Sequence, residues 1–360
     1  MQKKVVFLAD CLVTQKAGIH FYARQFIKRA ITQYPGNQYY TVLPYPYEQL
    51  NVEEILVPIR KWVPGHFRMR SFREIPRVVR KLNPDLVIEM AHFGPFNLPD
   101  SIQKATVIHD LTPINFPEWH GKSSYYSHKY LLPKILKSSD QLIVNSIQTK
   151  QDLADYFPAC KDKTTVCYPC LLDDPTGSSV DSTGLLAEAN YLLSVGTIEP
   201  RKNYVTLIRA FDKLASKYSK LQLRLVGYKG WKSKNVFELI ERSSYKDRII
   251  LEGYTTDNRL RSLYAHATAF VFPSLYEGFG LPLLEALSYN VPIVCSDIPT
   301  SREICGNAAL YFSATDDRSL VEQTLQLLKN EDFHTAQAIK SQVRFLEFNQ
   351  AKLPLDSLLG

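Results

Sequence analysis

Two glutamates eight positions apart, Glu277 and Glu285, flank a Gly-Phe-Gly step in the stretch PSLYEGFGLPLLEAL (273–287). Carboxylates accept hydrogen bonds from pairs of hydroxyl groups, which are abundant on sugars and on ribose. The two glycines allow backbone conformations that other residues avoid, and Pro282 is favourable in the first turn of a helix. A helix N-terminus presents N–H groups that bind anions such as phosphate. The stretch therefore suits a ligand with hydroxyl groups at both ends and phosphate between them, such as a nucleotide sugar.

A second polar cluster, SVGTIEPRKN (194–203), follows another apolar run. Gly196 ends that run, and Arg201 and Lys202 stand where a helix is predicted to begin. Two cations at the start of a helix oppose the helix dipole, and a bound diphosphate would remove this conflict. Taken singly, the Arg-Lys pair could be a charged surface loop, EGFG an ordinary turn and Glu285 a solvated helix residue. Their joint occurrence favours a binding site.

The first half of the chain contains two weaker motifs of the same kind. In VIHDLTP (107–113), His109 and Asp110 follow an apolar run. A histidine at this place could hydrogen-bond a ligand hydroxyl, carry a proton or be purely structural. In KAGIHFYARQF (16–26), Gly18 opens a predicted helix and would let a phosphate or an acceptor approach the backbone closely.

Short apolar runs rich in β-branched and aromatic residues alternate with longer stretches of helical periodicity. This order is typical of parallel sheets covered by helices, so we predict an α/β fold with two doubly wound parallel-sheet domains. The predicted strands are 4–10, 39–45, 85–90, 105–110, 141–146 and 164–169 in the first domain, and 191–197, 221–228, 248–254, 268–274 and 291–297 in the second. The predicted helices include 18–34, 71–82, 123–138, 147–156 and 203–218.

The predicted domains are 1–172 and 191–333, joined by a linker over 173–190 that is rich in Ser, Gly, Asp and Pro. Residues 334–360 are predicted to form a C-terminal helical segment, whose packing the sequence leaves open. In doubly wound sheets, ligands bind beyond the carboxyl ends of the strands, and two such domains can hold a ligand in the cleft between them. The motifs above lie at predicted strand ends, which places the candidate site there.

The composition is that of an ordinary globular protein, with 45% hydrophobic and 22% charged residues over 360 positions. No apolar stretch approaches the roughly 18 residues of a membrane span, and the apolar run after Lys4 is too short for a signal peptide. We therefore expect a cytoplasmic protein whose six cysteines are free thiols. Cys167 and Cys170 form a CxxC pair, but no second ligand pair follows at zinc spacing, so no metal site is predicted.

The formal net charge is +7, and a dense basic stretch lies at 60–81, with eight Lys or Arg residues against the single Glu74. Trp62, Phe67 and Phe72 are interleaved with the cations. Such a stretch can bind an anionic membrane surface, or it can form a solvated helix face. Nucleic acid is not a predicted partner, because no nucleic-acid-binding motif accompanies the charge.

Taken together, these motifs resemble those of the retaining glycosyltransferases of family 4, which have the GT-B fold of two facing Rossmann-like domains. The resemblance covers nearly the whole chain and depends most on the two glutamates, backed by GTIEPRKN and IHDLTP. It implies that Glu277 contacts hydroxyls of the donor sugar and that Glu285 holds the ribose. It also implies that Lys202 and Arg201 neutralise the diphosphate, and that His109 lies across the cleft near the sugar.

The resemblance assigns further donor contacts to the turn between Glu277 and the helix that carries Glu285, and to one aromatic residue. Backbone groups of Gly278, Phe279, Gly280 and Leu281 would hold the sugar and its phosphates, and Tyr254 would lie near the base. Gly196 is also predicted to contact the donor.

Two positions depart from the family pattern. Thr197 stands where many relatives have an arginine after the glycine that matches Gly196, so Arg201 would supply the second charge. The first-domain loop has Ala17-Gly18 where relatives often have two glycines, which weakens the case for phosphate contacts there.

The implied reaction is front-face transfer with retention at the anomeric carbon, in which a diphosphate oxygen takes the acceptor's proton. No cofactor and no metal are expected, because the chain has no Asp-x-Asp cluster in a suitable place. The partners would be a nucleotide-diphosphate sugar and a glycan or lipid-linked acceptor. The resemblance is greatest to bacterial O-antigen and exopolysaccharide enzymes, many of them mannosyltransferases. GDP-mannose is therefore the predicted donor, and a UDP-sugar is the alternative.

Three other classes remain open at this point. A glycoside hydrolase also uses two carboxylates, but it does not need a diphosphate-binding pair of cations. A sugar-nucleotide epimerase shares the tandem α/β architecture and would be distinguished by its product. A non-catalytic nucleotide-sugar sensor would bind the nucleotide without turnover. If residues 60–81 bind lipid, the protein would be peripheral on the inner face of the cell membrane.

Overall fold

The computed structural model describes residues 2–15, 18–60, 62, 65–172, 190–349 and 353–360. The chain forms two compact units, one of Met1–Cys170 with Ala351–Gly360 and the other of Leu171–Gln350. The predicted linker over 173–190 lies, except for Asn190, outside the described residues.

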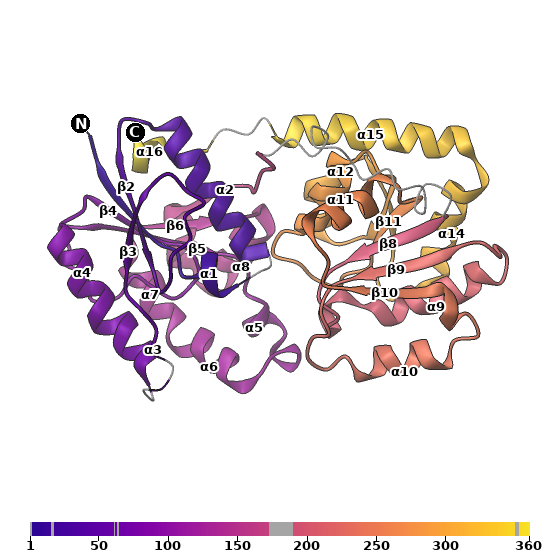
Figure 1. Cartoon of the computed structure of the whole chain (residues 1–360), viewed down its shortest axis with the longest axis horizontal. Coiled ribbons are helices and arrows are strands. Elements are labelled where there is room, and N and C mark those ends of the chain that lie inside the picture. The colour runs from indigo at the N-terminus through magenta and orange to yellow at the C-terminus, as the bar shows by residue number, and fades with distance from the viewer. Residues whose placement is uncertain (1, 16–17, 61, 63–64, 173–189, 350–352) are drawn as a thin grey trace. The chain divides into compact units, whose positions relative to one another are not determined.

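The described part of the first unit contains a seven-stranded sheet in the order β3-β2-β1-β4-β5-β6-β7, with every neighbouring pair parallel (Figure 1). The chain turns back at β1, as it does in doubly wound sheets. The strands are β1 (Lys4–Leu8), β2 (Gln38–Leu43), β3 (Glu53–Leu56), β4 (Leu86–Glu89), β5 (Gln103–Ile108), β6 (Gln141–Val144) and β7 (Thr164–Val166).

The helices of this unit follow the strand ends. They are α1 (Cys11–Thr14), α2 (Gly18–Gln33), α3 (His66–Met69), α4 (Ile75–Leu82), α5 (Thr112–Asn115), α6 (Lys122–Tyr130), α7 (Leu132–Ser138), α8 (Ile147–Tyr156) and α16 (Asp356–Leu359). A π-helical turn over Arg70–Glu74 joins α3 to α4. The single helix predicted over 123–138 is wrong: Pro133 lies in the first turn of α7 and separates it from α6.

Strand β1 shows how the first sheet is buried on both faces. Val5 and Phe7 belong to a core that includes side chains of α2, whereas Val6 and Leu8 belong to a second core that includes side chains of α4. Because both faces are covered, the strand is a continuous apolar run and not an alternating one. This is the pattern by which it was predicted.

The described part of the second unit contains a six-stranded sheet in the order β10-β9-β8-β11-β12-β13, again with parallel neighbours. The strands are β8 (Tyr191–Val195), β9 (Gln222–Val226), β10 (Ile249–Gly253), β11 (Ala269–Phe272), β12 (Ile293–Ser296) and β13 (Ala309–Phe312). The helices are α9 (Tyr204–Ala215), α10 (Lys234–Arg242), α11 (Asp257–Ala265), α12 (Leu281–Ser288), α13 (Pro299–Cys305), α14 (Asp317–Lys329) and α15 (Glu331–Asn349). Two doubly wound parallel sheets confirm the predicted fold class.

The C-terminal residues, whose packing the sequence left open, divide between the two units. Helix α15 packs in the second unit, where Ser341 Oγ donates to the Val291 carbonyl at 3.0 Å. The last residues pack in the first unit, where the Leu358 carbonyl accepts from Lys3 Nζ at 2.9 Å and the Leu359 carbonyl accepts from Asn37 Nδ2 at 2.8 Å. Leu358 and Leu359 are buried in the core that contains α2.

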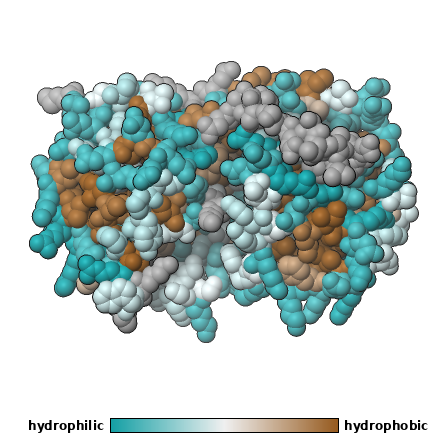
Figure 2. Space-filling model, viewed as in Figure 1, coloured by the Kyte–Doolittle hydropathy of each residue, from teal (hydrophilic) through white to brown (hydrophobic). Residues whose placement is uncertain are grey.

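Among the described residues, no helix combines the length and the apolar character needed to cross a membrane. On the face shown in Figure 2, hydrophobic side chains form separate patches among hydrophilic ones. The six cysteines all lie in the described ranges and are buried free thiols. Within those ranges, no group of three or more His, Cys, Asp or Glu side chains is arranged to hold a metal ion.

Candidate active site

The loop after β8 is held in place by its neighbours in the sheet. The Ile198 N–H donates to the Tyr228 carbonyl at 2.9 Å, and the Gly230 N–H donates to the Ile198 carbonyl at 3.0 Å. A Cβ on Gly230 would lie 2.7 Å from the Ile198 carbonyl oxygen, so this contact requires glycine. The loop then forms a 3₁₀ turn over Pro200–Lys202, immediately before α9.

The loop after β11 is tied to the first loop, because β8 and β11 are neighbours in the sheet. The Leu275 N–H donates to the Arg201 carbonyl at 2.8 Å, and Asn203 Nδ2 donates to the Pro273 carbonyl at 3.0 Å. Thr300 Oγ1 donates to the Glu277 carbonyl at 2.8 Å. Hydrogen bonds therefore hold the two loops together at the carboxyl edge of the second sheet.

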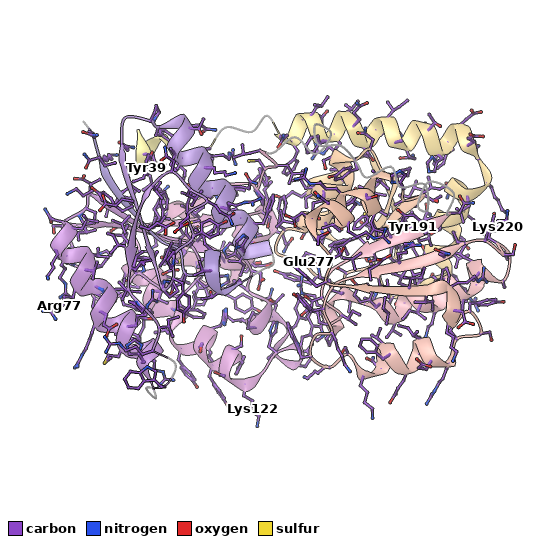
Figure 3. The ribbon with its side chains drawn as sticks, in the orientation of Figure 1. Tyr39, Arg77, Lys122, Tyr191, Lys220 and Glu277 are labelled. Carbon is purple, nitrogen blue, oxygen red and sulfur yellow. The ribbon has the colours of Figure 1, made fainter. Side chains whose placement is uncertain are left out.

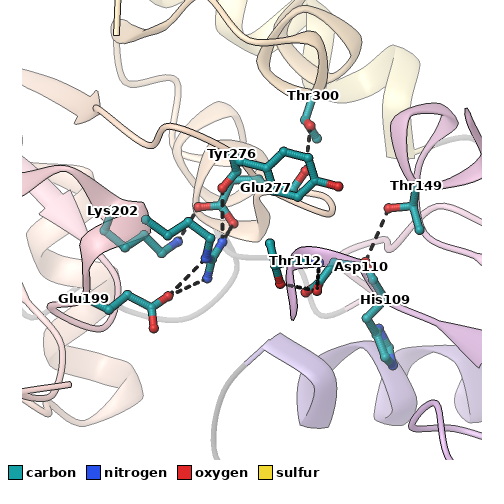
Figure 4. Close-up of polar contacts among 10 residues, drawn as sticks. His109, Asp110, Thr112, Thr149, Glu199, Lys202, Tyr276, Glu277 and Thr300 are labelled. Carbon is teal, nitrogen blue, oxygen red and sulfur yellow. Dashed lines mark hydrogen bonds and ion pairs between the residues drawn. The ribbon is translucent and has the colours of Figure 1, made fainter. Parts of the chain in front are cut away.

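This arrangement brings together four charged side chains, Glu199, Arg201, Lys202 and Glu277, which we call the charged cluster (Figure 4). Lys202 Nζ donates to Glu277 Oε1 at 2.6 Å, and Arg201 Nη1 donates to the other oxygen, Oε2. Arg201 also donates to Glu199 Oε1, from Nη2 at 2.7 Å and from Nε at 3.1 Å. The structure thus joins the predicted catalytic residues of the second domain, and adds Glu199, which the sequence analysis missed although it lies inside the quoted motif.

Burial and charge act in opposite directions on the cluster. Burial by itself raises the pKa of Glu277, but the positive charges of Arg201 and Lys202 outweigh it and hold that pKa below its ordinary value. Burial lowers the pKa of Lys202, an effect that the charge of Glu277 opposes only in part. Glu277 is therefore a carboxylate at neutral pH. A diphosphate that binds the two cations must share them with carboxylates that already contact them.

Gly196 leaves room for the lysine of the cluster. A Cβ on Gly196 would lie 3.0 Å from Lys202 Cε and 3.3 Å from Nζ, and the backbone φ of +152° is one that residues with a side chain rarely adopt. The Gly196 carbonyl accepts from Tyr204 Oη at 2.9 Å, which fixes this end of the strand. Its position beside Lys202 is thus explained by packing, and a direct contact of Gly196 with the donor stays a prediction.

Glu285 has different surroundings from Glu277. It lies half-buried on α12, where Tyr264 Oη donates to its Oε2 at 2.7 Å. Burial raises the pKa of Glu285, and the hydrogen bond from Tyr264 opposes this effect. A carboxyl group that already accepts one hydroxyl is suited to accept another, but its predicted contact with ribose stays a prediction.

The turn before α12 contributes its backbone. Gly280 has a φ of +103° and precedes the first helical residue, Leu281, with Pro282 in the first turn. The side chain of Phe279 is buried, with its ring centroid 5.9 Å from that of Phe348. Because this side chain is committed to packing, any ligand contact of Phe279 would come from its backbone, as would those of Gly278, Gly280 and Leu281.

Tyr254 stands at the end of β10, beside the end of β9, and is 53% exposed. Its ring stacks on Tyr228, with centroids 4.8 Å apart and planes 12° from parallel. The sequence analysis did not select Tyr228, although both tyrosines follow a glycine at a strand end, in LVGY and LEGY. The pair offers an exposed aromatic face, and a role in binding the base stays a prediction.

In the first unit, His109 lies buried at the end of β5 and contacts a second histidine. Its Nε2 bonds to the Met90 carbonyl at 2.8 Å, and its backbone N–H donates to His92 Nε2 at 2.9 Å. Because a carbonyl only accepts, the proton of His109 lies on Nε2, and Nδ1 is left as an acceptor. Burial lowers the pKa of His109, so the ring is neutral at neutral pH. The predicted role of His109 toward the sugar would then be to accept a hydrogen bond from a hydroxyl.

Two further expectations for the first unit concern Gly18 and the basic stretch. Gly18 is the exposed first residue of α2, and the two residues before it lie outside the described ranges. The basic residues of 60–81 that the structure describes are exposed, with one exception: Arg70 is buried and donates to both oxygens of Asp10. Arg70 is thus a structural ion-pair partner and not part of a lipid-facing surface, which corrects the expectation. Figure 3 shows Arg77 pointing outward from α4.

Comparison with known proteins shows that the chain is similar to glycosyltransferases. The profile described as "Glycosyl transferases group 1" matches residues 179–344, and the profile described as "Glycosyltransferase Family 4" matches residues 19–171. Both profiles describe glycosyltransferases, and they match consecutive parts of the chain. The chain aligns with O-antigen chain mannosyltransferase B from Escherichia coli at 33% identity over 251 residues, which is 67% of this chain and 66% of that protein. The chain thus spans just under two thirds of that relative's length.

Solved structures show the fold of this chain. WaaG, a glycosyltransferase involved in lipopolysaccharide biosynthesis, matches with a TM-score of 0.77 at 14% identity, over 98% of both chains. HepE from Anabaena, crystallised in complex with UDP-glucose, matches with a TM-score of 0.73 at 16% identity, over 97% of this chain and 98% of that one. These likenesses confirm the GT-B class.

Proposed function

We propose that the chain is a retaining hexosyltransferase that moves mannose from GDP-mannose to a glycan or lipid-linked acceptor in cell-surface polysaccharide synthesis. The observation that carries the proposal is the charged cluster, in which Arg201 and Lys202 meet Glu277 where β8 and β11 end. Cations close to a helix N-terminus match a diphosphate, and a carboxylate matches the hydroxyls of a sugar. A glycoside hydrolase is less well supported, because its reaction does not require a diphosphate-binding pair of cations.

In this proposal, the charges act on the bond between the anomeric carbon and the diphosphate. As that bond breaks, negative charge grows on the diphosphate and positive charge grows on the sugar ring. Lys202, Arg201 and the N–H groups at the start of α12 stabilise the leaving diphosphate, and the carboxylate of Glu277 is placed for the hydroxyls of the sugar. The departing oxygen takes the acceptor's proton on the same face, so configuration is retained and no protein base is required.

The choice of donor rests on the relative in Escherichia coli, which is named a mannosyltransferase. The alternative, a UDP-sugar, is supported by HepE, whose structure contains UDP-glucose. The two differ in the base and in the sugar, so the released nucleoside diphosphate distinguishes them.

The test is a donor screen with intact bacterial membranes as the source of acceptor. GDP and UDP release is measured for a panel of nucleotide sugars, and labelled sugar is followed into the membrane or glycan fraction. GDP release from GDP-mannose with label transfer is expected, and release of UDP alone would overturn the choice of donor. Glu277→Ala should abolish release, whereas Glu322→Gln, on the exposed face of α14, should leave it unchanged.

The same variant separates the proposal from its rivals. If Glu277→Ala binds the nucleotide at least as tightly as the wild type but has lost turnover, the protein is an enzyme and not a nucleotide-sugar sensor. An epimerase would return a nucleotide sugar of changed configuration without transfer to an acceptor. A hydrolase would cleave an oligosaccharide without any nucleotide.

We also propose that the exposed part of 60–81 binds the cytoplasmic face of an anionic membrane. Arg68, Arg73 and Arg77 are exposed, as is Trp62 at 80% of its surface. Replacing the three arginines with glutamine should weaken sedimentation with anionic liposomes, most strongly at low salt, because the attraction is screened over about 10 Å at 0.1 M. Arg70 is left intact because it holds Asp10. Unchanged binding would mean that these arginines are only solvated.

A further inference from the structure

Glu199 orients the guanidinium of Arg201. Its side chain is buried, with 3% of its surface exposed, at the start of the turn that carries both cations. A single oxygen, Oε1, accepts from Nη2 at 2.7 Å and from Nε at 3.1 Å. The remaining terminal nitrogen, Nη1, is thereby directed to Glu277. Arg201 thus has one carboxylate on each side.

Glu199 also sets the charge of the cluster. With Glu277 alone opposite two cations, the cluster would carry one net positive charge, whereas the second carboxylate brings the formal sum to zero. A nucleoside diphosphate carries its negative charge on the same group that the cations would bind. Each buried carboxylate next to those cations therefore weakens the binding of that ligand.

We propose that Glu199 is a positioning residue that holds Arg201 in its orientation and, through its negative charge, limits the affinity for the nucleoside diphosphate product. This inference rests on the proposed function. A nucleoside diphosphate bound to two cations without a compensating carboxylate would dissociate slowly. Release of product limits turnover in many enzymes. Glu199 supplies a negative charge on the side of Arg201 away from Glu277, the residue proposed to contact the sugar.

The deciding variant is Glu199→Gln. Because one oxygen of Glu199 accepts both bonds from Arg201, the carbonyl oxygen of glutamine can accept them too, and only the charge is removed. We expect the Kd for the nucleoside diphosphate, measured by calorimetry with GDP and UDP, to fall about tenfold, which corresponds to about 1.4 kcal/mol. The product-inhibition constant should fall in parallel, and kcat should fall while kcat/KM for the donor does not.

Two further variants separate orientation from charge. Glu199→Ala removes the acceptor as well, so kcat/KM for the donor should fall at least tenfold below that of Glu199→Gln. Glu199→Asp keeps the charge but shortens the reach, and it should not tighten product binding. Glu322→Gln removes one exposed charge from the same unit and should leave the Kd unchanged within twofold. Thermal melting confirms that each variant is folded.

The outcomes separate this inference from the function on which it rests. If Glu199→Gln leaves the Kd unchanged or raises it while Lys202→Met weakens nucleotide binding, the inference is overturned and the proposed diphosphate site stands. If Lys202→Met also leaves the Kd unchanged, the diphosphate is bound elsewhere and both are overturned. A purely structural Glu199 would weaken binding in every variant, which is the opposite sign to the one expected for glutamine.

Discussion

Replacing Lys202 with methionine tests the central electrostatic argument. The lysine ammonium lies 2.6 Å from Glu277 Oε1 and 5.1 Å from the centroid of the Phe272 ring. Methionine keeps most of the apolar stem that fills the space beside Gly196 and Phe272, and removes the charge. Lys202→Ala would add a cavity to the loss of charge, so methionine is the cleaner change.

The expected loss of stability is small compared with the loss of activity. Two unit charges 2.6 Å apart attract each other by about 6 kcal/mol at an effective dielectric constant of about 20. Most of this is offset because the buried lysine no longer has to be desolvated, and Arg201 still contacts the other oxygen of Glu277. We expect a net loss of about 1–3 kcal/mol, less than the roughly 5–15 kcal/mol by which proteins are stable.

The activity should fall much further. Removing one preorganised charge that stabilises a developing anion typically lowers kcat about 10²–10³-fold, or about 3–4 kcal/mol. The assay is the initial rate of nucleoside diphosphate release in the presence of acceptor membranes, with a thermal melt of each protein as the measure of folding. Lys213→Met is the matched control, because Lys213 forms an exposed ion pair with Asp317 on the same unit.

Activity of Lys202→Met within about twofold of the wild type would refute the reasoning, since the diphosphate would then be held elsewhere. A variant that no longer folds would refute the stability argument, because it would show that Arg201 cannot compensate Glu277 alone. The control should retain its activity within twofold.

Three other perturbations are predicted from the structure. Gly196→Ala should lower kcat/KM about tenfold, because its Cβ would lie 3.0 Å from Cε of Lys202 and its φ of +152° would be strained; wild-type kinetics would contradict this. Glu89→Gln should raise the melting temperature at pH 8 but not at pH 4. Burial, and secondly the charge of Asp10, raise the pKa of Glu89 to about 8. The wild-type fold therefore loses stability as the pH rises from about 4.5 through 8, because the buried carboxyl group ionises. If the melting temperatures of the two proteins change in parallel with pH, this prediction is wrong. EDTA should leave transfer unchanged, whereas a loss that Mg²⁺ restores would show that a metal is required.

Sequence periodicity was sufficient for the central strands of both sheets and for the edge strands β7 and β10, but it missed the other two edge strands. The central strands could be predicted because their continuous apolar runs have no other explanation at that length. Strand β3 was missed because only two of its four residues are apolar and the other two are glutamates. Strand β13, at the edge of the second sheet, was missed as well.

The buried arginine of the first unit shows a similar limit. In the sequence, Arg70 is one of the eight Lys and Arg residues between positions 60 and 81. Its burial depends on Asp10, which is 60 positions away and follows β1. Only the packing of the π-helical turn against the end of that strand decides which of the cations is removed from solvent.

The sequence by itself determined which residues of the candidate site stand at strand ends, because glycines and prolines interrupt the apolar runs there. It did not determine that Arg201 and Lys202 bind Glu277, which is 75 positions from Lys202. That contact exists because β8 and β11 are neighbours in the sheet although two strands separate them along the chain. The order of strands is set by how helices cover both faces of the whole sheet, and a local pattern of residues carries no record of it.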